Sequence, residues 1–545
     1  MFPPLVDQIM AILDKVGKDA LLKHLKERPA ITLDYGTAGF RTLSDNLPSC
    51  IQRCALLMLL RSMATKRHVG LMITASHNPE KDNGVKMVDP DGGMLNQSWE
   101  KSANLLVNSA TPYETLKEIV EVERIEDAYS GVVVLGCDTR KSSPMLAKLA
   151  VDILNLFDTK VIDLGTVTTP VLHYIVRRQR IASKKELIDQ YYSKKRLHFE
   201  SLAKQFPTSW QLGGKIIIDC ANGVGYECMT QFLDLIHGLC VNRPGDGPLN
   251  HECGADYVQK YCKMPQIYSG GSDISSDSIL ASLDGDADRL VLLKRKADGG
   301  GIVLADGDKF ACLVAHFLSS HIQALELQLS LVVAQTGYSD GAATAFLESL
   351  HGVQVVTTLT GVKNLEKALH DADIGIYWEP NGHGNVICSD KAWEKLNQHS
   401  VTRNAAAGKS LRTLTDILSL ANETVGDGVL NLLLVYAILA LRKKSFDDWM
   451  QLYTPRKNKY LKVRVRNKDV VQTVDIDRRI TAPTKLKAAV ENLKRENVRI
   501  LIRKSGTEDV IRVFAEASTD ELANETARLA ARAVWETCDG VGDQP

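Results

Sequence analysis

Residues 69–79 read VGLMITASHNP, and the interpretation of the fold starts from this stretch. Its apolar half, 69–73, predicts a buried strand, so Ser76 stands in a polar loop just beyond a strand end. His77 follows directly, and Lys86 lies a little further on. A hydroxyl with an imidazole and an ammonium group nearby is the composition of a phosphoryl-transfer nucleophile. The alternative is a simple turn, because Asn and Pro favour turns and Ser can cap a following helix.

A second motif, ASLDGDADR at residues 281–289, places three aspartates at alternate positions: Asp284, Asp286 and Asp288. Carboxylates in a tight loop can converge on a hard divalent cation, and Mg²⁺ prefers oxygen ligands together with a phosphate. An EF-hand is excluded, because Arg289 stands where that loop requires Gly and Arg295 stands where it requires a bidentate Glu. A solvated acidic turn is the remaining alternative, although three carboxylates repel one another unless neutralised.

The third motif, YWEPNGHG at residues 377–384, separates Glu379 from His383 by a rigid Pro-Asn-Gly turn. Two polar side chains held over a small ligand suit the hydroxyl groups of a sugar. A surface turn with a solvated Glu and His is the competing interpretation.

The fourth motif, RKSGTEDVIR at residues 503–512, follows an apolar strand predicted at 498–502. Hydroxyl groups, backbone N–H groups and two flanking arginines, Arg503 and Arg512, are the ingredients of a phosphate cradle. The alternative is a Ser-Gly-Thr turn that caps a helix. A fifth stretch, YGTAGFR at 35–41, brings Arg41 beyond a Gly-hinged turn, and by itself it is barely specific.

Taken in order, these stretches resemble the α-D-phosphohexomutase family, in its active-serine, metal, sugar and phosphate loops. The resemblance covers nearly the whole chain. It implies a four-domain α/β architecture around a central active-site cleft, with three α/β domains and a C-terminal α+β domain. The boundaries we expect are 1–178, 179–297, 298–452 and 453–545, with one signature loop in each domain.

The order of one further element discriminates within the family. The Gly-x-Asp-x-Arg element, which most members carry before the active serine, here comes after it, as GCDTR at 136–140. This order and the wording DNGVKMVDPDGGML at 82–95 resemble the subfamily that acts on N-acetylglucosamine phosphate. A mutase for glucose or mannose phosphate explains all but the order, and a non-catalytic sugar-phosphate-binding protein is a third interpretation. Lys504 stands where the phosphate loop of the family commonly has Pro, and Pro380 stands where the sugar loop commonly has a small residue. We expect these two differences to affect substrate affinity more than activity.

The resemblance also implies roles for the candidate residues. Ser76 would carry a phosphate and bind one Mg²⁺ together with the three aspartates, and a hexose 1,6-bisphosphate would be the activator. Lys86 is the candidate general base, which requires its pKa to be lowered by a cationic neighbourhood including Arg41. His77 and Arg41 would orient the phosphoryl group, and the Asn381 amide would meet an acetamido group. The expected substrate-binding residues are Arg289, Lys363, Glu379, Asn381, His383, Arg503, Ser505, Gly506, Thr507 and Arg512.

Composition sets outer limits. The length of 545 residues suggests three or four domains, and 66 basic residues balance 66 acidic residues. No net field therefore favours nucleic acid or a membrane surface as a partner, and the expected partner is a small-molecule sugar phosphate. Eleven cysteines without a CxxC pair indicate reduced thiols, and the start MFPPLVDQIM lacks the features of a signal peptide. We expect a cytoplasmic protein that is a monomer or a weak homo-oligomer.

The pattern along the chain predicts parallel α/β layers, with strands at 132–135, 215–219, 331–334 and 374–377 between helical stretches. Residues 184–205 are charged, with apolar residues at helical spacing, and they predict a helical insertion with a solvated face. The most apolar stretch, 429–441, is too short to span a bilayer and predicts a buried helix.

Overall fold

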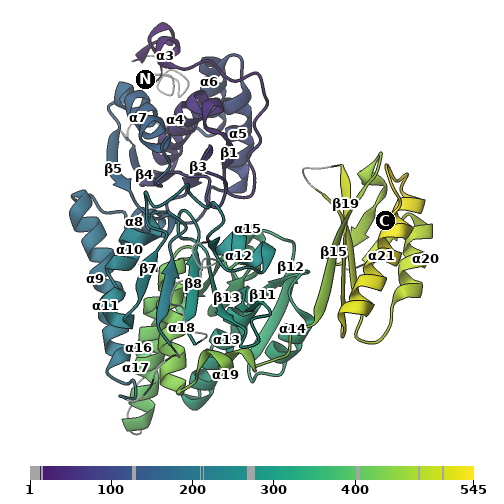
Figure 1. Cartoon of the computed structure of the whole chain (residues 1–545). Coiled ribbons are helices and arrows are strands. Elements are labelled where there is room, and N and C mark those ends of the chain that lie inside the picture. Colours follow the sequence, from purple (N-terminus) through teal and green to yellow (C-terminus); the bar gives the residue numbers. More distant parts are fainter. Residues whose placement is uncertain are drawn as a thin grey trace. The chain divides into compact units, whose positions relative to one another are not determined.

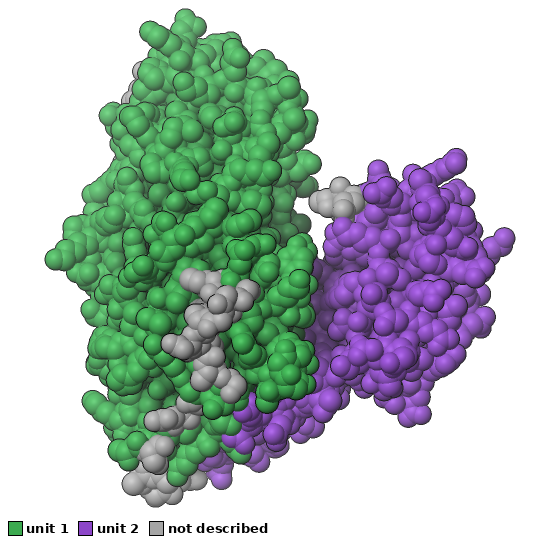
Figure 2. Space-filling view, viewed as in Figure 1, with its two compact units in different colours: residues 1–307, 380–388, 408–446 green, residues 308–379, 389–407, 447–545 purple. Residues whose placement is uncertain are grey.

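The computed structural model describes residues 13–545, apart from 14–15, 126–130, 209, 211, 213, 267–276, 400–404, 477–478 and 506–508. The chain divides into two compact units (Figure 2). Unit 1 comprises residues 1–307, 380–388 and 408–446, and unit 2 comprises residues 308–379, 389–407 and 447–545. The domain boundaries expected after residues 178, 297 and 452 stay predictions.

The first sheet of unit 1 has the strand order β1-β3-β2-β4-β5 (Figure 1). The pairs β1–β3 and β2–β3 are antiparallel, whereas β2–β4 and β4–β5 are parallel. The strands are β1 (Phe40–Leu43), β2 (Val69–Ile73), β3 (Asp82–Val88), β4 (Val132–Cys137) and β5 (Lys160–Thr166). The accompanying helices are α3 (Lys18–His24), α4 (Pro48–Thr65), α5 (Gln97–Asn108), α6 (Pro112–Val122), α7 (Ser143–Leu154) and α8 (Thr169–Arg178).

Helix α4 lies at the centre of this part of the core. Its sequence is apolar on nearly every side, and the helix is buried accordingly. The one buried cation on it, Arg53, donates to the carbonyl oxygens of Leu106, Val107 and Ser109, where α5 ends. Because a helix C-terminus carries unpaired carbonyl groups and a partial negative charge, this contact ties α5 to α4.

The second sheet of unit 1 has the order β10-β9-β8-β6-β7, with β6–β7 and β6–β8 parallel and the other pairs antiparallel. The strands are β6 (Ile216–Asp219), β7 (Leu239–Val241), β8 (Ile279–Leu283), β9 (Leu290–Arg295) and β10 (Ile302–Ala305). The remaining elements of unit 1 are α9 (Lys184–Ala203), α10 (Gly225–Thr230), α11 (Leu233–Ile236), α12 (Ala255–Tyr261), β14 (Gly384–Cys388), α17 (Ala405–Leu420) and α18 (Gly428–Arg442).

Unit 2 begins with a parallel arrangement of three strands in which β11 lies between β12 and β13. These strands are β11 (Leu331–Thr336), β12 (Val353–Thr358) and β13 (Ile374–Trp378). The helices around them are α13 (Gly307–Ala324), α14 (Gly341–Glu348), α15 (Val362–Ala368), α16 (Asp390–Gln398) and α19 (Phe446–Met450).

The C-terminal part of unit 2 is an antiparallel sheet of order β15-β19-β18 with α21 packed along β15 and β19 (Figure 1). Its elements are β15 (Lys457–Arg464), β18 (Arg499–Lys504), β19 (Val510–Ala517), α20 (Thr484–Leu493), α21 (Asp520–Thr537) and the short pair β16 (Gln472–Val474) and β17 (Arg479–Ala482).

Several expectations from the sequence are confirmed at the level of single elements. The strands predicted at 69–73, 132–135, 215–219, 331–334 and 374–377 are β2, β4, β6, β11 and β13, and the predicted insertion forms α9. The apolar stretch 429–441 forms α18, which is buried over almost its whole length. Among the described residues, no helix is both long and apolar enough to cross a membrane.

Candidate active site

Ser76 lies just beyond the carboxyl end of β2 and is almost completely buried, with 1% of its surface exposed. Its backbone takes the left-handed region, with φ of 49°, which is unusual for a residue other than Gly. Its N–H group donates to Thr74 Oγ1 over 2.9 Å. Backbone strain of this kind persists only where the surroundings fix the conformation, as they do here.

The element GCDTR at 136–140 provides part of that fixation. Asp138 Oδ2 accepts hydrogen bonds from Thr74 Oγ1 at 2.7 Å and from Arg140 Nε at 3.0 Å. Arg140 Nη2 in turn donates to the Ser76 and Asn78 carbonyl oxygens, both at 2.9 Å. The guanidinium group thus holds the serine loop by its backbone and leaves the Ser76 side chain available.

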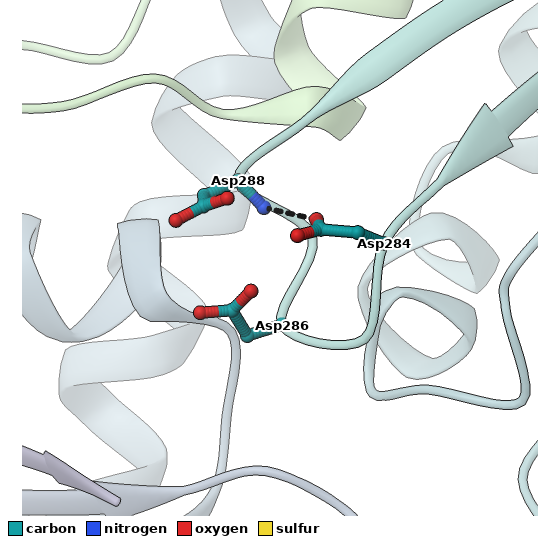
Figure 3. A group of neighbouring side chains, drawn as sticks. All are labelled: Asp284, Asp286 and Asp288. Atoms are coloured by element: carbon teal, nitrogen blue, oxygen red, sulfur yellow. Dashed lines mark hydrogen bonds between the residues drawn. The ribbon is translucent and has the colours of Figure 1, made fainter. Parts of the chain in front are cut away.

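The metal loop joins β8 to β9 and turns its three carboxylates toward a common space (Figure 3). One ligand oxygen from each of Asp284, Asp286 and Asp288 lies within 4.8 Å of the others. Asp284 Oδ1 accepts the N–H groups of Asp288 and Arg289, both at 3.1 Å, which closes the turn. Burial, with the charges of Asp288 and Asp286, raises the pKa of Asp284 well above its ordinary value.

Each of the three carboxylates keeps one oxygen without a hydrogen-bond partner among the described residues: Asp284 Oδ2, Asp286 Oδ1 and Asp288 Oδ1. Buried oxygens of this kind are costly unless a cation or a donor satisfies them. Arg289 Nε lies 3.8 Å from Asp284 Oδ2 and 3.9 Å from Asp288 Oδ1, too far for a hydrogen bond. Three buried carboxylates in one loop, with one oxygen from each within 4.8 Å of the others, fit a hard divalent cation, which takes carboxylate ligands and completes its shell with phosphate or water. The donor set therefore agrees with the metal site that the sequence predicts.

Ser76 and the metal loop meet at Asp286. Its Oδ2 atom accepts hydrogen bonds from Ser76 Oγ at 3.1 Å and from Thr169 Oγ1 at 2.6 Å. The backbone oxygen of Asp286 also accepts the N–H group of Thr169 at 3.2 Å. The first residue of α8 thereby orients one metal-loop carboxylate toward the serine.

Lys86 on β3 also reaches this group. Its Nζ atom donates to Asp286 Oδ2 and to Asp288 Oδ2, both at 2.7 Å. Burial disfavours the ammonium form, but the two carboxylates outweigh burial and raise the pKa of Lys86 above its ordinary value. The lowered pKa that we expected from the sequence is therefore wrong for this arrangement. The sequence around Lys86 does not show that two carboxylates 200 and 202 positions away come to the amine.

Arg41 and Arg289 act electrostatically on His77, the residue that follows Ser76. Burial, with the charges of Arg289 and Arg41, lowers the pKa of His77 to about 3, so its ring is neutral. Burial and Arg289 also lower the pKa of Arg41. His77 Nδ1 is buried without a hydrogen-bond partner in the described part of the chain, and a cavity of about 640 Å³ opens beside it. An anionic ligand would stabilise this arrangement.

The sugar loop brings His383 to the same centre. His383 Nδ1 lies 3.4 Å from Asp288 Oδ1, and Asn381 Oδ1 accepts the backbone N–H group of His383 at 2.9 Å. Gly382 between them has φ of 86°, and a Cβ atom there would lie 2.1 Å from the Leu290 carbonyl oxygen. Only glycine fits this close approach to β9. Glu379, at the end of β13, belongs to unit 2.

The phosphate loop lies in unit 2, where three cations cross the C-terminal sheet in one row. Lys462 on β15 pairs with Arg512 on β19, which pairs with Arg503 on β18. Arg512 Nη2 also donates to Ser505 Oγ at 3.3 Å, and Arg503 Nη1 donates to Thr360 Oγ1 at 3.3 Å. Like charges directly opposite one another destabilise a sheet, so this row suits an anionic ligand that offsets the repulsion.

Three other predicted substrate residues are not placed at either centre. Gly506 and Thr507 lie outside the described residues. Lys363 lies in the first turn of α15, in unit 2.

Sequence reasoning missed four contributors to these contacts. Thr169, Asn250 and Asp256 carry no local signal, because each acts on a loop distant in sequence: Asn250 Nδ2 donates to the Ser76 carbonyl oxygen at 2.8 Å, and Asp256 pairs with Arg289 at 3.2 Å. Lys462 had a usable signal. In the stretch YLKVRVR at 460–466, apolar and basic residues alternate, and this alternation predicts a strand with one cationic face.

Comparison with known proteins supports the family resemblance. Residues 181–291 and 306–444 match the models "Phosphoacetylglucosamine mutase AMG1, domain II" and "domain III". Residues 55–114 and 107–184 match the α/β/α domain I of phosphoglucomutase/phosphomannomutase, and residues 461–533 match its C-terminal domain. The four-domain α/β architecture expected from the sequence is confirmed.

Individual relatives cover nearly the full length. Phosphoacetylglucosamine mutase of Homo sapiens is 39% identical over 532 residues, which is 96% of this chain and 97% of that protein. The crystal structure of Aspergillus fumigatus N-acetylphosphoglucosamine mutase in complex with GlcNAc-6P and magnesium is 33% identical, with a TM-score of 0.86, over 98% of this chain and 99% of that one. A serine-to-alanine variant of the same enzyme, in complex with glucose 1,6-bisphosphate, matches with a TM-score of 0.83 and 32% identity over 99% of this chain and 100% of that one.

Proposed function

Because the chain belongs to the phosphoacetylglucosamine mutases of the α-D-phosphohexomutase superfamily, we propose that it interconverts N-acetylglucosamine 6-phosphate and N-acetylglucosamine 1-phosphate. The observation that carries the proposal is the buried contact between Ser76 Oγ and Asp286 Oδ2 at 3.1 Å, beside two further carboxylates and Lys86. A serine in this position can hold a phosphoryl group against a divalent cation and release it to a sugar hydroxyl.

In the proposed reaction the resting enzyme carries a phosphoryl group on Ser76 Oγ. The bond from phosphorus to Ser76 Oγ breaks as a bond forms to the free hydroxyl oxygen of the sugar phosphate. Lys86 would accept the hydroxyl proton once a divalent cation occupies Asp286 and Asp288, because the amine then loses the two contacts that raise its pKa. The resulting 1,6-bisphosphate turns over. Its other phosphoryl group then returns to Ser76 Oγ, and Lys86 gives the proton back to the sugar oxygen that it leaves.

The metal-loop residues Asp284, Asp286 and Asp288, with the phosphate on Ser76, would hold one Mg²⁺, which neutralises charge that develops on the transferring group. A hexose 1,6-bisphosphate would act as activator, because it can restore the phosphoryl group to an unmodified Ser76. The complexes of the Aspergillus fumigatus enzyme with GlcNAc-6P and magnesium, and of its variant with glucose 1,6-bisphosphate, support both assignments by similarity.

The other site residues have proposed roles that follow from their charge and hydrogen-bonding capacity. Arg41, His77 and Arg289 would orient the phosphoryl group near Ser76. Glu379 and His383 would bind ring hydroxyl groups, and Asn381 would donate to the acetamido oxygen. The phosphate that does not react would be bound by Arg503, Ser505, Gly506, Thr507 and Arg512, with Lys462 as a third cation and with Lys363 as a further contact to the substrate.

We propose a cytoplasmic enzyme that is a monomer or a weak homo-oligomer. The state of the cysteines supports this compartment, because all eleven are free thiols and ten of them are at least partly buried.

The proposal is tested by assaying conversion of N-acetylglucosamine 6-phosphate with Mg²⁺ and a trace of glucose 1,6-bisphosphate, beside the 6-phosphates of glucose and mannose. We expect the acetylated sugar to be preferred, and Ser76→Ala to show no turnover above background. Ser98→Ala is the matched control, because Ser98 is exposed on α5 and its hydroxyl group donates, among the described residues, to Asn96 Oδ1 alone. Peptide mass spectrometry of the isolated protein should find phosphate on Ser76.

Two results would overturn the proposal in different ways. Equal or better turnover of glucose or mannose phosphate would keep the mechanism and change the substrate. Absence of any mutase activity, with an unphosphorylated Ser76, would favour a sugar-phosphate-binding protein.

A further inference from the structure

The inserted helix α9 buries a lysine in its core-facing stripe. The stripe consists of Leu187, Tyr191, Lys195, Phe199 and Leu202, one residue per turn. Lys195 has no exposed surface, although lysine is among the residues least often buried unless it is paired. The solvated face that the sequence indicates for this helix therefore accounts for only part of its charge.

Lys195 is bound to the end of another helix. Its Nζ atom donates to the carbonyl oxygens of Ser419 at 2.9 Å and Ala421 at 2.5 Å, where α17 ends. Carbonyl groups at a helix C-terminus have no partner within the helix and favour a positive charge. The neighbouring Lys194 pairs with Glu423 at 2.6 Å, so two consecutive lysines hold the chain beyond α17.

Tyr191 holds the other end of the same segment. Its hydroxyl group donates to Asp427 Oδ2, and Asp427 Oδ1 accepts the Leu430 N–H group at 3.0 Å, which caps the N-terminus of α18. We call residues 421–428 the bracing segment. Helix α9 thus fixes it at its start through Lys195 and at its end through Tyr191.

The bracing segment contacts the metal loop directly. Gly428 N–H donates to the carbonyl oxygen of Ala287 at 2.9 Å, and Ala287 stands between Asp286 and Asp288. A Cβ atom at Gly428 would lie 2.4 Å from the Arg289 carbonyl oxygen, so the two backbones are in close contact. A shift of the bracing segment must therefore move or release the backbone between the two carboxylates.

The same segment is tied to the sugar loop and to α8. Asn385 Nδ2 donates to the Asn422 carbonyl oxygen at 2.9 Å, just beyond His383. Asn422 Nδ2 donates to the Pro170 carbonyl oxygen at 3.3 Å, next to Thr169, which bonds to Asp286. Three separate connections run from the bracing segment to the centre that contains Ser76.

We propose that Lys195 and Tyr191 are positioning residues of α9, which hold the bracing segment so that the three carboxylates of the metal loop converge at the spacing a divalent cation requires. This gives the 184–205 insertion a role in metal affinity without a contact to metal or substrate. A measurement of metal binding tests this proposal independently of the proposed mutase activity, whereas a kinetic measurement rests on that activity.

The test compares Lys195→Met with Lys185→Met, an exposed lysine near the start of the same helix. Methionine keeps the length and apolar stem of Lys195 and removes the donors. Binding of Mn²⁺, which takes the same oxygen ligands, is titrated by electron paramagnetic resonance without any sugar phosphate present. We expect Lys195→Met to weaken Mn²⁺ binding about tenfold, the lower end of the about 10–100-fold that loss of a direct partner of a metal ligand costs, because Lys195 acts through the bracing segment. Lys185→Met should bind Mn²⁺ as the wild type does.

Kinetics provide the second readout. The Mg²⁺ concentration for half-maximal activity should rise by a similar factor in Lys195→Met, while kcat at saturating Mg²⁺ stays close to the wild-type value. If wild type shows no mutase activity, the proposed function fails while the Mn²⁺ titration still decides on Lys195.

Wild-type Mn²⁺ affinity in Lys195→Met, whatever its melting temperature, would overturn the inference and leave the lysine with a structural role only. If Lys195→Met does not fold, Tyr191→Phe decides, because it removes only the hydroxyl group that holds Asp427. Unchanged Mn²⁺ affinity in folded Tyr191→Phe would then overturn the inference, and a loss of affinity would support it.

Discussion

Thr169, the first residue of α8, connects this helix to the metal loop through the hydroxyl group of its side chain. Thr169→Val removes its 2.6 Å donation to Asp286 Oδ2 and keeps the shape of the side chain. We expect the Mg²⁺ concentration for half-maximal activity to rise about tenfold, because Asp286 loses a partner that orients it. Activity measured against Mg²⁺ concentration checks this.

The adjacent Thr168 supplies the matched control. Its hydroxyl oxygen accepts the Val171 N–H group and caps α8, whereas the hydroxyl groups that donate to Asp286 in the described part of the chain are those of Ser76 and Thr169. Thr168→Val should lose about 1 kcal/mol of stability, the usual cost of a lost N-cap, and keep the wild-type Mg²⁺ requirement. An equal change in Mg²⁺ requirement in both variants would contradict the role of Thr169.

Lys195 gives the stability of the protein a pH dependence with a defined sign. Burial, opposed by Glu423, lowers its pKa from 10.5 to about 7. Above about pH 7 the folded state loses this proton while the unfolded state keeps it until about pH 10.5, so stability rises with pH over that window. The neutral amine still offers two N–H groups to the two carbonyl oxygens. The charged groups that act on Lys195 are Lys194 on α9, Arg178 on α8, and Glu423 and Asp427 in the bracing segment.

Urea unfolding at a series of pH values measures this contribution. The free energy of unfolding of wild type minus that of Lys195→Met should increase from about pH 7 to about pH 9, by at most about 1.4 kcal/mol per pH unit. A flat difference over this range would show that Lys195 has the same protonation state in the folded and unfolded chain.

At the scale of single residues, the sequence identified side chains whose chemistry is written in a local motif. Ser76 and the three aspartates are recognisable because the candidate nucleophile and the candidate metal ligands stand at short, characteristic spacings. The pKa of Lys86 in the metal-free chain was predicted in the wrong direction, because it depends on Asp286 and Asp288, which reach the amine only in the folded chain.

At the scale of elements, we expect lysines on the two faces of strand β15 to differ in their effect on substrate binding. Lys462 belongs to the cation row with Arg512 and Arg503, whereas Lys459 pairs with Ala515 and points to the opposite side of the sheet. If the row binds the non-reacting phosphate, Lys462→Met should raise the KM for the sugar phosphate about tenfold, because a hydrogen bond to a charged group contributes about 1.5–3 kcal/mol. Turnover at saturation should change little.

The control for this prediction is Lys459→Met, which removes the same charge from the same strand. Both variants lower the net charge equally, so a general electrostatic effect on substrate approach would raise both KM values alike. The prediction fails if the two variants have the same KM, and Lys462→Arg should restore part of the loss.

Element types followed from periodicity, but their contacts did not. The apolar spacing in 184–205 predicted α9, and the same stripe contains Lys195, which a helical pattern alone assigns to neither core nor surface. Its partners are the backbone carbonyl oxygens of Ser419 in α17 and of Ala421 just beyond it, more than 200 positions further along the chain. No local pattern encodes such a contact, because any residue type supplies a carbonyl group.

At the scale of the whole molecule, the four-domain architecture was predictable because each signature loop follows its own strand in a fixed order. The division into two compact units was not. Unit 1 takes segments 380–388 and 408–446 from the later part of the chain, since the sugar loop and the bracing segment pack against the metal loop. Packing of this kind depends on how the side chains and backbones of distant segments fit together, and a local sequence motif contains no information about that.

The same division predicts how metal binding affects stability. All three candidate metal carboxylates lie in unit 1, and burial with the charges of Asp288 and Asp286 disfavours the charged form of Asp284 in the metal-free chain. Mg²⁺ at about 100 times its dissociation constant should therefore stabilise unit 1 by about 2.7 kcal/mol and leave unit 2 unchanged. Scanning calorimetry with and without chelator measures this stabilisation. Leu57→Ala, which leaves a cavity beside the buried helix α4, identifies the transition of unit 1, because it should lower the midpoint temperature of that transition alone. Asp284→Asn should abolish the Mg²⁺ effect. An equal upward shift of both transitions in wild type, or a shift that survives in Asp284→Asn, would contradict a metal site built within unit 1.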